Sequence, residues 1–243
     1  LIKKLFGEDL RLSISQIEKY YSNPYEYFLQ YGLRLKKRNQ FTVDAALSGT
    51  YYHSIFEQVI NRLIGKRTDF HDLSDQELKK LSQESAQNLI ELPDFQILQS
   101  DDHFRAVARS LTDDVLLTLK LMHRANRLNN SRPIKTEAVF GKLSSDQQRE
   151  QSLSGLDFTL ANGRKIYLRG KVDRIDQQDL EHIFGTIIDY KSNGKVFDFR
   201  DAYVGTELQL LTYWLALSKN SSRIGINQPG GAVFVQIRNK PAD

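Results

Sequence analysis

The chain has 243 residues, of which 40% are hydrophobic and 26% charged, a balance typical of a folded globular protein rather than a disordered one. It contains no cysteine, which excludes disulfides, thiolate metal sites, iron–sulfur clusters and cysteine nucleophiles within it. The net charge of +4 permits a polyanionic partner without requiring one.

The apolar stretches of the chain are short. None approaches the roughly 20 residues that cross a bilayer, and a cysteine-free composition suits a reducing environment. We therefore expect a cytoplasmic protein with no membrane partner. Because the chain begins without Met and stops just after a strand-like run, we also expect it to be part of a longer protein.

Helical patterns fill the first half of the chain. A periodic segment from Gln16 to Tyr31 follows two candidate capping residues, Ser13 and Ser15, and Pro24 should divide it into two short helices. Further on, apolar side chains recur at helical spacing. The helices expected there run from just after Gly49 to Gly65, from Asp75 to Glu91 and from Asp102 to Leu128.

The pattern changes near Pro133, where apolar and polar side chains begin to alternate as in half-buried strands. The pair Asn162-Gly163 predicts a hairpin turn between two of these strands. The sequence therefore predicts an α/β fold in one domain, with a mainly helical part (1–132) and a mixed-sheet core (133–243). The expected core elements are strands at Glu137–Leu143, Gly155–Leu160, Lys165–Leu168, Lys171–Asp176, Thr186–Tyr190 and Gly231–Ile237, and a helix at Glu207–Ser218.

Two of the expected strands carry the most informative side chains. Asp189 and Lys191 end an apolar strand, and because side chains alternate they share one face, with Tyr190 on the other. Asp173 lies on the preceding strand, so a hairpin would bring its carboxylate to the same end. An isolated Asp-x-Lys triplet more often serves turns and surface ion pairs, and that interpretation stays open.

Two carboxylates and an ammonium group at one site favour metal-assisted chemistry on phosphate. Carboxylate oxygens suit Mg²⁺ or Mn²⁺. Such a cation activates water and stabilises charge on a phosphodiester, while a nearby lysine orients the water or neutralises developing negative charge. We therefore predict that Asp173, Asp189 and Lys191 are catalytic residues.

Two helices offer further candidates. Gln209 and Tyr213 lie one turn apart and can hydrogen-bond a nucleic-acid strand, although Tyr213 also fits a core position. His53 and Glu57 likewise share one helix flank. A lone histidine there is more often structural than a ligand, yet neutral imidazole is an acceptable ligand for Mn²⁺. Both interpretations stay open for each helix.

Taken in order, these segments resemble a known family. The ordered motifs resemble the RecB-type branch of the PD-(D/E)XK nucleases. They are His53, Gly170-x-x-Asp173-Arg174-x-Asp176, Asp189-Tyr190-Lys191 and Gln209-x-x-x-Tyr213. Three further segments are similar to the AddB/RexB family of helicase/deoxyribonuclease proteins, namely Leu12–Glu18, Asn23–Phe28 and Pro229–Val235. This resemblance covers nearly the whole chain and implies a restriction-endonuclease-like core, a mixed central sheet flanked by helices.

The resemblance also implies roles for the candidate residues. The metal, Mg²⁺ or Mn²⁺, would be bound by His53, Asp173, Asp189 and the backbone carbonyl of Tyr190. Lys191 would serve the attacking water, and Gln209 and Tyr213 would hold the DNA. Glu137 sits where related nucleases often carry an acidic residue before the core sheet.

The family further implies a biological setting. The domain would be an exonuclease-type deoxyribonuclease acting on single-stranded DNA ends. It would work beside a partner subunit of the AddA/RexA type in an ATP-dependent complex that resects double-strand breaks for recombinational repair. No P-loop motif occurs in the chain, so we expect ATP to be bound elsewhere.

One departure from the AddB pattern concerns Asn23, which stands where AddB proteins carry the first of four cluster cysteines. The chain therefore resembles the cluster-free, RexB-like variety. Without a cluster, we expect aromatic core packing to hold the N-terminal helices, through Tyr20, Tyr21, Tyr25, Tyr27 and Phe28; a platform for base stacking is the alternative for these side chains. Two alternatives stay open, a stand-alone RecB-like exonuclease of the CRISPR adaptation type and a catalytically silent DNA-binding scaffold.

Overall fold

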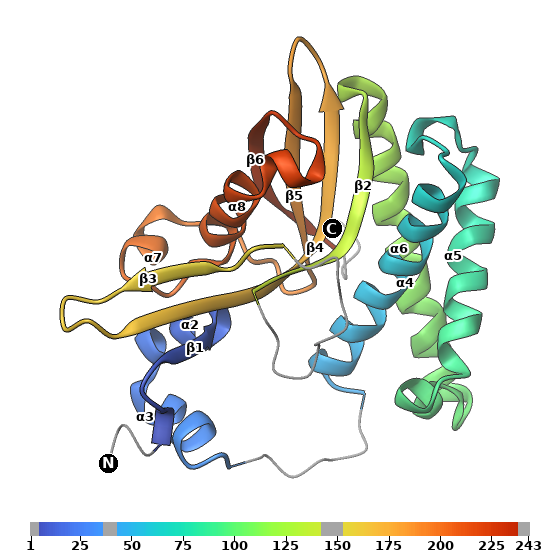
Figure 1. The fold of residues 1–243 in the computed structure, drawn as a ribbon. Coiled ribbons are helices and arrows are strands. Elements are labelled where there is room, and N and C mark those ends of the chain that lie inside the picture. The colour runs from blue at the N-terminus through green and yellow to red at the C-terminus, as the bar shows by residue number, and fades with distance from the viewer. Residues whose placement is uncertain (1–4, 36–42, 142–152, 238–243) are drawn as a thin grey trace.

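The computed structural model describes residues 5–35, 43–141 and 153–237. Figure 1 shows a mixed sheet with helices on both sides. In chain order the elements are β1 (Leu10–Ser13), α2 (Ile14–Ser22), α3 (Pro24–Tyr27), η1 (Phe28–Gly32), α4 (Ala45–Lys66), η2 (Phe70–Asp72), α5 (Asp75–Ile90), η3 (Pro93–Gln99), α6 (Asp102–Asn129), β2 (Ser131–Phe140), β3 (Leu156–Thr159), β4 (Lys165–Asp179), β5 (Ile183–Lys191), α7 (Phe199–Tyr203), α8 (Gln209–Lys219), η4 (Ser221–Ile224) and β6 (Gln228–Gln236).

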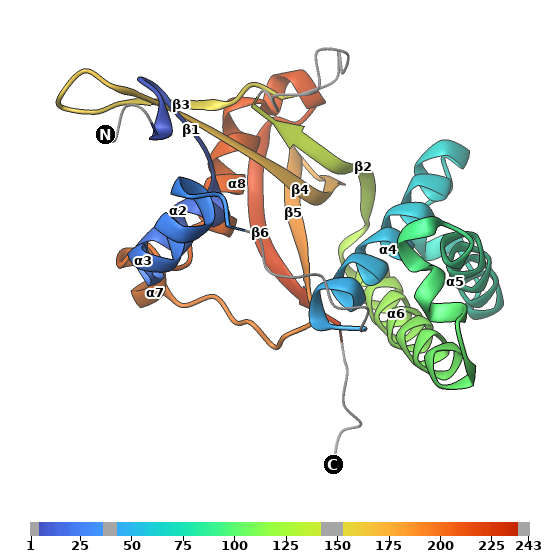
Figure 2. The ribbon, with the colours of Figure 1, turned by 90° about the horizontal axis from the view of Figure 1, so that it is seen from below.

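The long strand β4 organises the sheet. Its first part pairs with β1 in parallel and with β3 in antiparallel orientation. Its second part pairs with β2 and β5, both antiparallel, and β5 pairs in parallel with β6. The hairpin of β3 and β4 therefore extends beyond the part of the sheet that the long helices cover, as both ribbon views show (Figures 1 and 2).

Two hydrophobic clusters hold the layers together. On one face of the sheet, Ile188 and Tyr190 of β5 pack into the cluster of α4, α5 and α6. On the other face, Ile187 packs with Leu217 of α8. Neighbouring residues of β5 thus enter opposite cores, because strand side chains alternate. The result confirms the predicted mixed central sheet flanked by helices.

Side-chain caps explain where the helices begin. Ser13 and Gln16 form a capping box at the start of α2. Asn23 caps α3 by accepting the N–H of Glu26 at 3.0 Å, and Pro24 takes its first position. The predicted division into two short helices is therefore confirmed, with Ser13 rather than Ser15 as the first cap.

The start of α4 differs from the prediction. Asp44 caps this helix through the N–H of Leu47, so it begins before Gly49. It ends at Lys66, and Arg67 takes the left-handed conformation. The expected stop at Gly65 is therefore confirmed within one residue. The helices α5 and α6 match their predictions within a residue at each end.

Several strands also differ from the prediction. The segments Lys165–Leu168 and Lys171–Asp176 form the single strand β4. The strand β2 begins at Ser131 rather than Glu137, and the expected continuation through residues 142–143 lies outside the described residues. The elements β1 and α7 were not predicted, because short segments of four or five residues carry little periodicity. The predicted turn at Asn162-Gly163 is confirmed.

The N-terminal aromatic residues contradict the expected core packing. Tyr20, Tyr21 and Tyr25 are between 50% and 71% exposed, and Phe28 is 38% exposed. Tyr27, by contrast, is enclosed by other rings, with centroid distances of 5.1–5.9 Å to Phe6, Tyr20 and Tyr31. Contact between α2 and α8 holds this region instead, since Glu18 accepts the N–H groups of Leu208 and Gln209.

None of the described helices combines sufficient length with sufficient apolar character to cross a bilayer.

Candidate nuclease active site

Asp173 lies where the strands β4 and β5 meet. Its Oδ2 accepts the backbone N–H of Tyr190 at 2.9 Å, and Nδ1 of His53 lies 3.2 Å from the same oxygen. The strand register places Arg174 opposite Ile188, so Asp173 and Asp189 occupy neighbouring positions on the two strands. The two aspartates therefore converge at one end of the hairpin, as the alternation along β5 predicts.

His53 projects toward Asp173 from α4. Its neighbour Tyr52 and the residue Phe56 are buried in the core, and this packing fixes the helix against the sheet. Burial lowers the pKa of His53, but the hydrogen bond with Asp173 and the charges of Asp173, Asp189 and Glu137 together raise it above its ordinary value. The imidazole is therefore held in an acidic environment.

Glu137 completes this acidic group from β2. Its φ angle of 48° is left-handed, a conformation that costs a residue with a side chain about 1–3 kcal/mol. The register of β2 against β4 is the same on both sides of Glu137, with Thr136 opposite Arg174 and Ala138 opposite Val172. Burial raises the pKa of Glu137, while an ion pair with Lys171 opposes the rise. Each of His53, Glu137 and Asp173 offers one donor atom, all within 4.8 Å of one another.

Asp189 and Lys191 lie beside this group and share one polar network. Lys191 Nζ lies 2.5 Å from Asp189 Oδ2 and donates to Gln209 Oε1 at 2.8 Å. The amide nitrogen of Gln209 donates to Asp189 Oδ1 and to the Tyr213 hydroxyl, both at 2.9 Å. Burial and the charge of Asp173 raise the pKa of Asp189 to about 6, although Lys191 opposes this.

Tyr213 is buried where α8 crosses the sheet. A Cβ atom at Gly170 would lie 2.6 Å from the Phe140 ring and 3.2 Å from the Tyr213 ring. The glycine of the Gly-x-x-Asp pattern is thus needed for this close approach. Tyr213 is 6% exposed, so its ring occupies a core position. Its role in holding DNA stays a prediction.

These residues border a cleft of about 790 Å³ between α2, α4 and α8. Five predicted site residues line it, namely His53, Glu137, Asp173, Gln209 and Tyr213. Asp189 and Lys191 are not among the lining residues, because Gln209 lies over them. The other lining residues include three charged ones that were not predicted as site residues, namely Glu18, Arg169 and Lys171, and also Glu57, which shares the helix flank of His53. Lys171 could have been predicted from the sequence, because it lies two residues before Asp173 and so shares its strand face.

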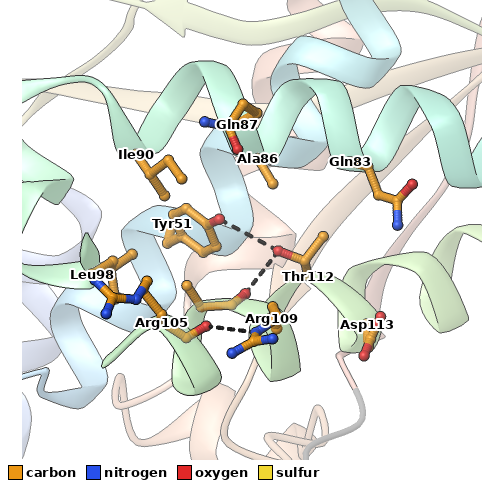
Figure 3. Close-up of a pocket in the computed structure, with 11 residues that line it drawn as sticks. Tyr51, Gln83, Ala86, Gln87, Ile90, Leu98, Arg105, Arg109, Thr112 and Asp113 are labelled. Carbon is orange, nitrogen blue, oxygen red and sulfur yellow. Dashed lines mark hydrogen bonds between the residues drawn. The ribbon is translucent and has the colours of Figure 1, made fainter. Parts of the chain in front are cut away.

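A second cavity, of about 630 Å³, lies among the long helices (Figure 3). Tyr51 and Thr112 meet there at 3.4 Å, and Arg109 donates to the backbone carbonyl of Arg105 at 3.3 Å. None of the predicted catalytic or metal-binding residues lines this cavity. Its chemistry therefore does not compete with that of the cleft beside the sheet.

The other face of the active strands holds a buried ion pair. Arg174 and Asp176 are each no more than 2% exposed, and Arg174 also donates toward the Tyr190 hydroxyl at 3.4 Å. The Tyr190 ring stacks on Phe56 with a centroid distance of 4.1 Å. The Tyr190 side chain is therefore held by Phe56 and Arg174, and the Tyr190 N–H in turn holds the Asp173 carboxylate by a hydrogen bond.

The chain is similar in sequence to several curated proteins that share one name. The chain is 44% identical over 237 residues to the B subunit of the ATP-dependent helicase/deoxyribonuclease of Leuconostoc mesenteroides, covering 97% of this chain and 19% of that protein. It is 41% identical to the protein of the same name from Leuconostoc citreum, covering 98% and 20%, and 33% identical to that from Latilactobacillus sakei, also covering 98% and 20%. The chain thus spans about a fifth of the length of these curated relatives.

The family match covers the same region. The sequence from residue 11 to residue 243 matches the PD-(D/E)XK nuclease superfamily, and this stretch includes every residue of the cleft described above. With its mixed sheet, its flanking helices and its Asp-x-Lys strand, the chain belongs to the PD-(D/E)XK nuclease superfamily.

Proposed function

We propose that this chain is a metal-dependent deoxyribonuclease domain that hydrolyses phosphodiester bonds of DNA in the cleft between α2, α4 and α8. One observation carries the proposal. His53, Glu137 and Asp173 present donor atoms within 4.8 Å of one another, directly beside the Asp189–Lys191 pair. A domain that only bound DNA would have no use for this many carboxylates near phosphate.

The donor set suits a hard divalent cation. One imidazole nitrogen and two carboxylate oxygens match the preferences of Mn²⁺, and the carboxylates match those of Mg²⁺. Asp189 adds a third carboxylate close to Asp173. A cation at this place would neutralise phosphate charge and make water a better nucleophile. We propose His53, Asp173 and Asp189 as ligands, with the Tyr190 carbonyl, and Glu137 as a further acidic contact.

Lys191 supplies a positive charge for the reaction. Gln209 and Asp189 hold its ammonium group in one orientation, so it can orient the attacking water or neutralise charge on the phosphate. Water adds to phosphorus, the bond to the leaving oxygen breaks, and that oxygen takes up a proton. The products are one phosphate end and one hydroxyl end. Gln209 and Tyr213, at the cleft wall, are placed to contact the strand.

The wider setting is proposed from the relatives. Their names describe them as B subunits of an ATP-dependent helicase/deoxyribonuclease, and the similarity extends over almost the whole of this chain. We propose that the domain acts as an exonuclease on single-stranded ends with Mg²⁺. It would do so within a helicase–nuclease that resects double-strand breaks and includes a partner subunit of the AddA/RexA type.

A cleavage assay tests the proposal. Labelled single-stranded DNA is incubated with the chain and Mg²⁺, and rates are compared for the parent, Asp189→Asn and Lys191→Ala. We expect each substitution to lower the rate more than about 100-fold with a melting curve that stays cooperative. Asp113→Asn is the matched control, because it removes a carboxylate from the cavity of Figure 3. A parent protein that binds DNA but never cuts it would support the scaffold alternative.

A further inference from the structure

The outer face of the β3–β4 hairpin carries a row of cations. Along β4, the alternate residues Lys165, Tyr167, Arg169 and Lys171 share one face. Their neighbours Ile166 and Leu168 point the other way and pack in the cluster under α8. The row therefore faces away from that core.

The flanking strands extend the same face. In the parallel pairing, Arg11 of β1 lies opposite Tyr167, and its guanidinium lies 5.4 Å from the centre of the Tyr167 ring. In the antiparallel pairing, Asp157 of β3 lies opposite Tyr167 on the other side. Cross-strand partners share a face, so four cations and one acidic residue lie on the same face as the Tyr167 ring. We name this surface the basic face: Arg11, Asp157, Lys165, Tyr167, Arg169 and Lys171.

The basic face leads directly into the cleft. A groove of about 320 Å³ lies over it, lined by Arg11, Asp157, Tyr167 and Arg169. Arg169 also lines the active-site cleft, together with Lys171 and Asp173. The strand β4 thus carries the positive row and the catalytic aspartate on one continuous path. From Lys165 to Lys171 the row is about 20 Å long, the length of about six stacked nucleotides.

We propose that the basic face is the track on which a DNA strand lies as it enters the active site. This inference rests on the proposed nuclease function and adds the path of its substrate. Phosphates match the cations at Arg11, Lys165 and Arg169, and the Tyr167 ring offers a stacking surface for a base. Lys171 already pairs with Glu137 at the cleft mouth, so it marks the end of the track.

Charge complementarity selects DNA over a protein partner for this face. A protein docking surface would be expected to expose apolar side chains at its centre. The exposed apolar residues of this hairpin are Phe158 (43%) and Leu160 (38%), and Phe158 lies opposite Ile166, on the other face from the cationic row. The prediction is accordingly a salt-dependent, sequence-independent contact.

The test compares two double variants in the Asp189→Asn background, so that binding is measured without cleavage. Arg11→Gln/Lys165→Gln neutralises two exposed cations of the basic face. Arg124→Gln/Lys79→Gln neutralises two exposed cations on α6 and α5, and leaves the same net charge. Affinity for a fluorescent single-stranded oligonucleotide is measured by anisotropy at several salt concentrations, and melting curves check folding.

We expect the basic-face variant to reduce the slope of log K against log salt by about 1.4, or about 0.7 for each lost phosphate contact. The control variant should keep the slope of the Asp189→Asn protein. Equal slopes in both variants, whether both lowered or both unchanged, would overturn the inference. Cleavage by the parent is recorded separately, so a failed track and a failed nuclease assignment give different results.

Discussion

The guanidinium of Arg174 donates two hydrogen bonds of 2.5 Å to the carboxylate of Asp176, on the face of β4 that lies away from the cleft. Around this pair stand the Phe70 ring, 5.5 Å from the guanidinium, and the Tyr190 hydroxyl. The pair is thus enclosed by the helical layer and touches the strand that carries Asp189 and Lys191. It links the stability of the helical half to the position of the active strands.

We predict that Arg174→Met destabilises the protein by about 3–5 kcal/mol, because it leaves the Asp176 carboxylate buried without a partner. The double variant Arg174→Met/Asp176→Leu should recover most of this loss, since a buried ion pair is often replaced by apolar side chains at little cost. Urea unfolding of the three proteins measures the difference. If the double variant is as unstable as Arg174→Met, the ion pair itself stabilises the folded protein, beyond the neutralisation of two buried charges.

Much of the fold was predictable because its signals are local. Apolar periodicity marked α5 and α6, and the Asn162-Gly163 pair marked the hairpin. The continuity of β4 was not predictable in the same way. Gly170 weakens the strand pattern, and only the packed rings of Phe140 and Tyr213 explain its place within one long strand. That reason is tertiary and leaves no pattern in the neighbouring sequence.

Among the site residues, too, some positions follow from local sequence patterns and others depend on tertiary structure. Alternation along β5 was enough to place Asp189 and Lys191 on one side. The position of Glu137 depends on a left-handed backbone angle inside a strand, and sequence periodicity cannot supply such an angle. The exposure of Tyr20, Tyr21 and Tyr25 was missed for a related reason. Aromatic residues in a helix indicate an apolar face, but not which surface covers it.

The buried carboxylate of Asp189 predicts a pH-dependent stability. Its pKa is raised to about 6 in the folded chain, from an ordinary value of 3.8. The folded state therefore favours the protonated group, and this contribution to stability is lost as the pH rises through about 6. Without divalent metal, the melting temperature should fall over this range. Asp189→Asn should show a smaller fall, because its side chain does not ionise.

Thermal melts across this pH range, with EDTA and with Mg²⁺, check the prediction. Mg²⁺ should stabilise the parent increasingly at higher pH, since metal binding needs deprotonated ligands, and should stabilise Asp189→Asn less. Identical pH profiles for the two proteins in EDTA would remove Asp189 as the origin of the effect.

Glu137 allows backbone strain and metal affinity to be separated. Glu137→Gly removes the carboxylate and also relieves the left-handed conformation, which is worth about 1–3 kcal/mol. Glu137→Gln removes only the charge. We expect both variants to bind Mn²⁺ more weakly, but only the glycine variant to offset the lost ion pair with Lys171. Calorimetric Mn²⁺ titration and melting curves give the two readouts. Unchanged Mn²⁺ affinity in both variants would exclude Glu137 from the metal site.

His53 distinguishes a metal ligand from a structural histidine. Its ring lies 3.2 Å from Asp173 on one side and packs edge-on against Tyr190, with a centroid distance of 6.0 Å, on the other. If the imidazole binds the metal, His53→Ala should weaken metal binding about 10- to 100-fold. The cleavage rate should then recover as the metal concentration is raised. If the imidazole is only structural, the melting temperature should fall, while the metal dependence of cleavage stays unchanged.

We expect the first outcome, because the Nδ1 atom already shares the cluster of donor atoms with Glu137 and Asp173. His123→Ala is the matched control. That histidine is buried within the helical layer, where its ring nitrogen lies 3.3 Å from the His71 carbonyl, and it does not line the cleft. Its loss should lower the melting temperature and leave the metal dependence of cleavage unchanged. A His53→Ala protein that behaves like this control would take His53 out of the metal site and leave the two aspartates and Lys191 in place.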